Sequence, residues 1–394
     1  MRLPLIFVIA TTVIDSMGIG LILPVMPALL REVADVPLAD AALYGGILVT
    51  AFAFMQFLFG PIIGSLSDRY GRRPVMLISL LVMALDYIVM ALAGAFWVLL
   101  VGRMVGGVAA ATQSTAAAFM ADISKPEEKA ARFGMIGAAF GMGFVFGPLL
   151  GGLLAEFGTR APFYAAAALA ATNLIFGYFV MPETLKPENR RPLTLARANP
   201  LGAFKNVSAT PQLRRLLWLF FLYQVAFMVY PAIWAFFTEE RFGWTPRMIG
   251  LSLGAFGIAM ALVQGGLIRL ILKWFGDRGT IIYGLVFNFF AFLVLAFVES
   301  GTLAILFIPL TALGAVVTPA VQGLMSRATS DNSQGELQGV LSSTAALATI
   351  ISPLIMTQVF PMAPSPTITT LMRISPYIGD MIANGINSQN RLIN

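Results

Sequence analysis

Long apolar stretches, separated by short polar loops, constrain this chain more than any other feature. A helix needs about 20 apolar residues to cross the hydrocarbon core of a bilayer. Eleven stretches of suitable length cover roughly 4–30, 42–64, 74–95, 97–120, 134–156, 162–181, 216–238, 249–271, 280–298, 303–325 and 338–360. Strands of a membrane barrel would read as about 10 alternating residues. The long unbroken stretches therefore predict an all-α, multi-pass membrane protein.

The composition excludes several classes of protein. Charged residues make up 11% of the 394 residues, whereas a soluble domain carries about 25%. This excludes a soluble enzyme, a disordered chain and a nucleic-acid-binding protein. The chain has no His and no Cys, so thiol nucleophiles, disulfides and His-ligated metals are impossible. We expect no cofactor, no metal site and no nucleic-acid partner, and we expect the lipid bilayer as surroundings.

Basic residues are distributed unevenly between the loops on the two sides. With the N-terminus placed in the cytoplasm, eighteen of the 25 Lys and Arg residues fall in cytoplasmic loops. The loops on the other side hold four, namely Arg31, Arg160, Arg241 and Arg247. Because Lys and Arg accumulate in cytoplasmic loops, this bias predicts a cytoplasmic N-terminus.

The polar stretches divide the chain. The longest, 182–215, holds seven basic residues and is predicted to be a cytoplasmic linker. It connects an N-terminal half of six helices (1–181) with a C-terminal half that has five clear helices (216–360). Residues 361–394 contain several prolines and charges but no apolar stretch of about 20 residues. We expect a divergent polar tail there in place of a twelfth helix.

The two halves carry an internal repeat. A shift of 205 residues superimposes Gly60 on Gly265, Gly71 on Gly276, Arg73 on Arg278 and Pro148 on Pro353. Parallel repeats of this kind are typical of secondary transporters, in which the substrate site lies near the bilayer midplane between the repeats. The sequence therefore predicts two pseudo-symmetric helical halves around a central site.

Two motifs support a transporter fold. Residues 64–73 read GSLSDRYGRR and resemble the hallmark loop of the major facilitator superfamily. Residues 143–152 read GFVFGPLLGG, which resembles a motif of its drug:proton antiporter branch. Over residues 1–356 the chain is most similar to the tetracycline efflux proteins of Gram-negative bacteria, for example at Leu85-Asp86-Tyr87, Gly102-Arg103 and Glu336-Leu337-Gln338-Gly339.

This resemblance implies a function. It implies a major facilitator fold in the bacterial inner membrane, which exports tetracycline-like or other amphipathic drugs by alternating access. The proton gradient supplies the energy, and the drug is carried alone or as a metal chelate. Gln56 and Gln264 are expected to contact the substrate because similar glutamines occur in the family.

The chain departs from the family pattern at two expected substrate contacts. The family has a carboxylate in the ninth helix where this chain has Asn288, and often a His in the eighth helix where this chain has Met260. Asn288 keeps the shape of an aspartate but carries no charge. A substrate other than a tetracycline–metal cation, such as a different amphipathic drug, is therefore favoured.

Two carboxylates, Asp15 and Asp86, lie deep within predicted membrane helices. A charge at the bilayer centre costs about 2.5–3.5 kcal/mol on insertion scales, so such residues indicate function. Without a His, carboxylates are the groups that can take up and release a proton. We expect Asp15 and Asp86 to couple proton movement to transport and Asp15 also to contact substrate. Arg103 either modulates these acids or fixes the fourth helix through a buried ion pair.

Two further sets of residues have expected mechanical roles. The loop residues Asp68, Arg69, Gly71, Arg72 and Arg73 are expected to form a gate whose charge pairs hold the halves together in the outward-facing state. The alternative is a basic loop that only sets the topology. Asp68 is expected near the N-terminus of the third helix, where the helix dipole favours a negative charge. Gly143, Gly147, Pro148 and Gly151 lie at helical spacing and predict a close helix contact.

Two alternatives remain open. The chain exports another small metabolite, or it is a poorly active variant whose last helix is disrupted. A membrane enzyme and a channel are disfavoured, because the sequence offers no nucleophile, metal cage or filter segment.

Overall fold

The computed structural model describes residues 2–109, 112–124, 129–185, 187–190, 211–328 and 334–359. Every regular element in these ranges is helical. The expected tail, 361–394, and most of the expected linker lie outside the described residues.

The described helices follow the predicted membrane segments. In the first half they are α1 (Arg2–Ile22), α2 (Met26–Ala34), α3 (Leu38–Tyr70), α4 (Arg72–Leu92), α5 (Phe96–Ala109), α6 (Thr112–Asp122), α7 (Lys129–Leu154) and α8 (Ala161–Val180). In the second half they are α10 (Pro211–Phe227), α11 (Val229–Phe242), α12 (Pro246–Leu262), α13 (Ile268–Phe297), α14 (Gly301–Thr311), α15 (Val317–Arg327) and α16 (Gln334–Val359). Among the described residues, eight helical stretches are long and apolar enough to cross a membrane. One of them, Pro246–Phe297, covers two predicted segments.

Several predicted segments are broken rather than straight. A 3-10 turn at Leu23–Val25 separates α1 from α2 at Pro24, because proline lacks the N–H that would continue the helix. Gly276 has φ of 63°, a conformation that glycine adopts without steric cost, and it turns the chain inside α13. A second 3-10 turn, Ala312–Gly314, separates α14 from α15. The last break leaves the carbonyls of Gly314 and Ala315 free to accept from side chains of other helices.

In the first half, α1 and α7 pack closely. An added Cβ at Gly147 would lie 2.6 Å from the Met17 carbonyl oxygen, and one at Gly151 would lie 2.8 Å from the Leu21 carbonyl carbon. Gly143 approaches the same helix, and Gly20 of α1 packs against the Pro148 ring. The predicted glycine face is thus the contact between these two helices.

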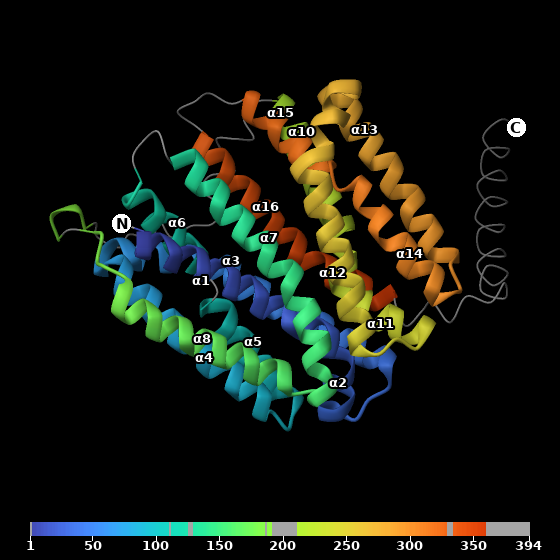
Figure 1. The fold of residues 1–394 in the computed structure, drawn as a ribbon, viewed down its shortest axis with the longest axis horizontal. Coiled ribbons are helices and arrows are strands. Elements are labelled where there is room, and N and C mark those ends of the chain that lie inside the picture. Colours follow the sequence, from blue (N-terminus) through green and yellow to red (C-terminus); the bar gives the residue numbers. More distant parts are fainter. Residues whose placement is uncertain are drawn as a thin grey trace, which may run out of the picture.

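The two halves meet along α7, α12, α3 and α16, which lie in the middle of the molecule (Figure 1). An added Cβ at Gly250 of α12 would lie 2.9 Å from Gly152 Cα of α7. An added Cβ at Gly45 of α3 would lie 2.7 Å from Cζ of Phe236 on α11. These close contacts between the halves depend on glycine, as the contact inside the first half does.

Ion pairs distinguish the two ends of the bundle. We call the end with the Asp68–Arg73 loop the basic end and the end with Asp35 and Gly243 the opposite end. At the opposite end, Arg247 Nη1 lies 2.8 Å from Glu156 Oε1, and Arg31 pairs with Glu239, so both pairs join the two halves.

At the basic end, the described ion pairs stay within one half. Arg72 lies 2.6 Å from Asp68 in the first half, and Arg327 lies 2.5 Å from Asp277 in the second. The charged contacts that connect the halves are therefore found at the opposite end.

The α1–α7 contact gives a stability prediction. Gly147→Ala places a methyl group against the backbone of α1, and overpacking of this kind costs about 1–3 kcal/mol. We expect a lower midpoint of heat-induced aggregation for the detergent-purified variant. Gly141→Ala on the same helix is the matched control, because nothing lies within 4 Å of its added Cβ. Equal midpoints for the two variants would contradict the assigned contact.

Candidate functional site

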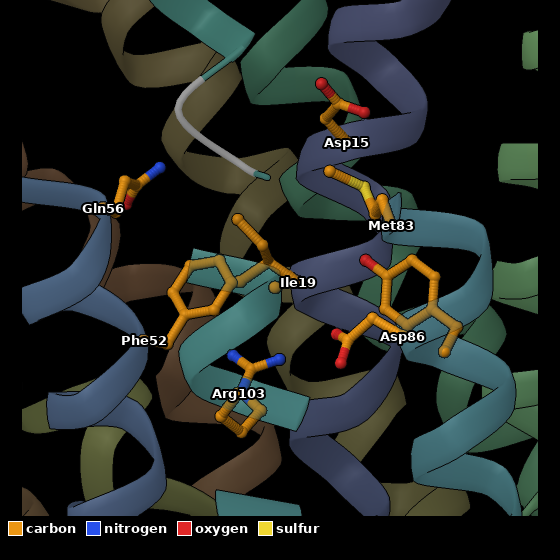
Figure 2. Close-up of a pocket in the computed structure, with 9 residues that line it drawn as sticks. Asp15, Ile19, Phe52, Gln56, Met83, Asp86 and Arg103 are labelled. Atoms are coloured by element: carbon orange, nitrogen blue, oxygen red, sulfur yellow. The ribbon is translucent and has the colours of Figure 1, made fainter. Parts of the chain in front are cut away.

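A narrow pocket inside the first half brings together most of the predicted charged site. Its lining includes Asp15 from α1, Phe52 and Gln56 from α3, Asp86 from α4 and Arg103 from α5. Asp86 and Arg103 point toward one another, whereas Asp15 lies on the other side of Met83 (Figure 2). All three charged residues are buried, with exposed fractions of 6%, 5% and 6% for Asp15, Asp86 and Arg103. The expected proton-coupling residues thus share one pocket.

Glycines on the neighbouring helices make room for these side chains. An added Cβ at Gly102 would lie 2.9 Å from Asp86 Oδ1, and one at Gly106 would lie 2.5 Å from its Oδ2. Gly18 of α1 likewise makes room for the ring of Tyr87, which also lines the pocket: an added Cβ at Gly18 would lie 2.9 Å from Tyr87 Cζ. The Asp86 carboxylate therefore lies against the bare backbone of α5, on the helix that carries Arg103.

The polar atoms of Asp86 and Arg103 are only partly satisfied. Asp86 Oδ1 and Arg103 Nε are buried and have no hydrogen-bond partner among the described residues. The Arg103 guanidinium instead lies over the Phe52 ring, with its carbon 4.2 Å from the ring centroid, as in a cation–π contact. The expectation of a buried ion pair that fixes α5 is not met in this conformation.

The size of the pocket limits what it can hold. Its volume is about 10 Å³, which is close to the space that one water molecule requires. A drug does not fit beside Asp86 in this conformation, whereas a proton or a water molecule does. Of the expected substrate contacts, only Asp15 and Gln56 lie here.

The other expected substrate contacts lie in the second half, around the break between α14 and α15. Asn288 Nδ2 donates to the carbonyls of Gly284 and Gly314, at 2.8 and 2.9 Å. Gln264 Nε2 donates to the Ala315 carbonyl at 3.1 Å. Met260 packs against the cluster that contains Ala312 and Val316. The amides of Asn288 and Gln264 thus bind carbonyls of residues 314–315, at the break between α14 and α15.

The predicted gating loop forms a network within the first half. Arg72 binds Asp68, and its Nε also lies 3.3 Å from Asp122 Oδ2. Arg73 Nη2 donates to the Tyr178 carbonyl at 2.7 Å. Gly71 has φ of 108°, which permits the turn between α3 and α4, and Arg69 lies against the neighbouring Tyr70 ring. An inter-half role of this loop in another conformation stays a prediction.

Glu183 is a residue of this network that the sequence did not reveal. Its carboxylate accepts from the backbone N–H groups of Arg72 and Arg73, at 3.0 and 3.2 Å. These are the first residues of α4, where a helix favours a negative charge. Asp68 was expected in this role, but it belongs to the C-terminal turn of α3. Nothing in the sequence indicates this contact, because Glu183 lies more than 100 residues from the first residues of α4, at the start of the polar stretch that follows α8.

Comparisons with known proteins agree with the family that the motifs resemble. Residues 8–355 match the Major Facilitator Superfamily. The chain is 42% identical over 357 residues to the tetracycline resistance protein, class C, of Escherichia coli, covering 90% of this chain and 89% of that protein. It is 38% identical over 361 residues to the class G protein of Vibrio anguillarum, covering 90% and 89%.

Solved structures share the fold. The human organic anion transporter MFSD10 superimposes with a TM-score of 0.69 at 28% identity, covering 91% of this chain and 93% of that one. The nucleoside transporter NupG gives a TM-score of 0.71 at 12% identity, covering 93% and 92%. The chain is therefore a multi-pass membrane protein of the major facilitator superfamily and belongs to the group that contains the Gram-negative tetracycline resistance proteins.

Proposed function

We propose that this protein exports tetracycline-like or other amphipathic drugs across the bacterial inner membrane in exchange for protons. The observation that carries this proposal is the buried pocket with Asp15, Asp86 and Arg103. Its size suits a proton rather than a drug, and the relatives that match nearly the whole chain are named as tetracycline resistance proteins. The family supports a drug as cargo, and the pocket supports a proton as the coupled ion.

The proposed mechanism is alternating access from a cytoplasm-facing conformation. With the basic end in the cytoplasm, as the Lys and Arg bias predicts, the ion pairs that join the halves lie on the periplasmic side. The halves are thus held together outside, while the described charges inside pair within each half. The transition to the outward-facing conformation requires both periplasmic ion pairs to separate.

In this mechanism Asp86 accepts the proton and Arg103 responds to its charge. When Asp86 is ionised, the guanidinium of Arg103 has an opposite charge in the same buried pocket. When Asp86 is protonated, that attraction ends and Arg103 retains its contact with Phe52. Because both charges are shielded from water, protonation changes the balance of forces in the first half strongly.

Asn288 favours cargo other than a tetracycline–metal cation. An amide is neutral, so Asn288 offers no negative charge to a metal-bound drug, and its Nδ2 already donates to two backbone carbonyls. Proteoliposomes with an imposed pH gradient test both the exchange and the cargo, with tetracycline and Mg²⁺ compared against lipophilic cations such as ethidium. Uphill movement of ethidium but not of tetracycline would support this role of Asn288. Movement of neither would remove the drug:proton exchange.

Substitution of Asp86 should affect uphill transport and drug–drug exchange differently. In Asp86→Asn, we expect uphill transport driven by a pH gradient to fall to background, because no proton is exchanged at this position. Drug–drug exchange at equal pH should persist, since it needs no net proton movement. Glu299→Gln, which changes an exposed acid, is the control. Equal loss of both activities in Asp86→Asn would indicate a structural role instead.

The periplasmic contacts can be tested with engineered thiols, because the chain has no native Cys. We expect a short, cleavable thiol cross-linker to join Glu156→Cys and Arg247→Cys in the double variant and to stop transport, since the halves can no longer separate there. Cleavage should restore activity, and each single-Cys variant serves as the control. Full transport after complete cross-linking would contradict the proposed gate.

A further inference from the structure

A second cavity lies in the other half of the protein, away from the charged pocket. Its lining comprises Tyr230, Ile233, Trp234 and Phe237 of α11 and Phe292, Leu295 and Ala296 of α13. Its volume is about 170 Å³, and no side chain in the lining carries a charge. An apolar cavity of about 150 Å³ suffices to bind benzene. The cavity is therefore large enough for one aromatic ring of a larger molecule.

The lining continues a row of aromatic side chains along one face of α10 and α11. Tyr223 stacks on Phe227 with ring centroids 5.8 Å apart, and Phe227 contacts Tyr230 at 6.1 Å. Tyr230 in turn lies 6.1 Å from Trp234. Tyr223 also lies 3.5 Å from Asn288 Nδ2, so the row connects the region of the α14–α15 break with the cavity.

The walls of the cavity are held in fixed positions. Tyr230 stacks nearly parallel on Phe292, with centroids 4.7 Å apart and an angle of 18° between the rings. Trp234 Nε1 donates to Ser252 Oγ of α12 at 2.9 Å. A flat, rigid wall of rings suits a planar aromatic ligand, because stacking then costs little side-chain entropy.

One polar atom in the cavity lining lacks a partner. Tyr230 Oη is buried and makes no hydrogen bond to any described residue. A buried hydroxyl without a partner is rare and unfavourable, so it identifies a position that an acceptor would stabilise. The hydrocarbon chain of a lipid offers no such acceptor, whereas a drug with a carbonyl or phenol oxygen beside its rings does.

We propose that this cavity binds a planar aromatic ring system that carries a hydrogen-bond acceptor, and that Tyr230 donates its hydroxyl to that acceptor. The inference rests on the proposed drug export and assigns the two tasks to different halves. The first half handles the proton at Asp86, and the second half holds the aromatic part of the drug between α11 and α13.

Filling the cavity tests the proposal most directly. Ala296 is exposed and lines the cavity, so Ala296→Trp places an indole in the space without replacing a buried side chain. We expect this variant to lose binding of metal-free tetracycline, measured by drug fluorescence with the purified full-length protein in EDTA at constant pH. Leu293→Trp is the matched control, because Leu293 is exposed on the same helix but does not line the cavity. Both variants must elute as single species.

Removing one oxygen tests the hydrogen bond. Tyr230→Phe keeps the ring, and loss of one neutral hydrogen bond should weaken tetracycline binding about 2- to 10-fold. Binding of ethidium, a planar aromatic cation without an oxygen acceptor, should stay unchanged. An equal effect on both probes would overturn the assigned role of Tyr230.

The outcomes separate this inference from the proposed function. Unchanged tetracycline binding in Ala296→Trp would overturn the cavity as a binding site, and drug export would stand if the unaltered protein still transports. Failure of the unaltered protein to bind or move either probe would overturn both. Displacement of a co-purified lipid by Ala296→Trp, with unchanged tetracycline binding, would show that the cavity is a lipid site.

Discussion

The burial of Asp86 and Arg103 in the same pocket is the interaction on which the rest of the account depends. Both groups are buried, and Asp86 Oδ1 and Arg103 Nε both lack a hydrogen-bond partner among the described residues. A fold keeps such groups at hydrocarbon depth only at a cost, which points to a functional reason for them. Gly102 and Gly106 leave the carboxylate space against α5, and Phe52 covers the guanidinium. A proton that neutralises Asp86 therefore changes the forces between α4 and α5 directly.

Such a local change reaches the rest of the molecule through closely packed helices. The α1–α7 contact, which lies within the first half, is formed by glycines with no space for a methyl group. Helices packed backbone to backbone move as rigid bodies, because a small shift of one immediately displaces the other. The charged contacts between the halves, Arg31–Glu239 and Arg247–Glu156, are by contrast partly exposed and can be exchanged for water. The structure thus combines rigid halves with a separable connection at one end.

The sequence identified the charged residues of the pocket, but it did not predict the contacts that polar residues make within the second half. Asp15, Asp86 and Arg103 were identifiable because charges within apolar stretches are rare, and the structure places them together. The glycine spacing of Gly143, Gly147 and Gly151 predicted a helix contact for the same reason, namely a regular local pattern. Gln264, Asn288 and Met260 were expected to contact substrate, and this stays a prediction. The structure adds that Gln264 and Asn288 donate to the carbonyls of Ala315 and Gly314. The break between α14 and α15 lies close to Pro309 and Gly314, but its hydrogen bonds to Gln264 and Asn288, like the contact of Glu183 with α4, depend on pairing across long separations.

Proton release on drug binding tests the central claim most directly. The account requires an ionisable Asp86 whose protonation state is linked to the drug, whichever half holds the drug. In weakly buffered detergent solution with a pH indicator, addition of a transported drug to the protein should release protons. Asp86→Asn should bind the same drug and release none from this site. Equal proton release by Asp86→Asn and by the unaltered protein, at equal drug occupancy, would contradict the account.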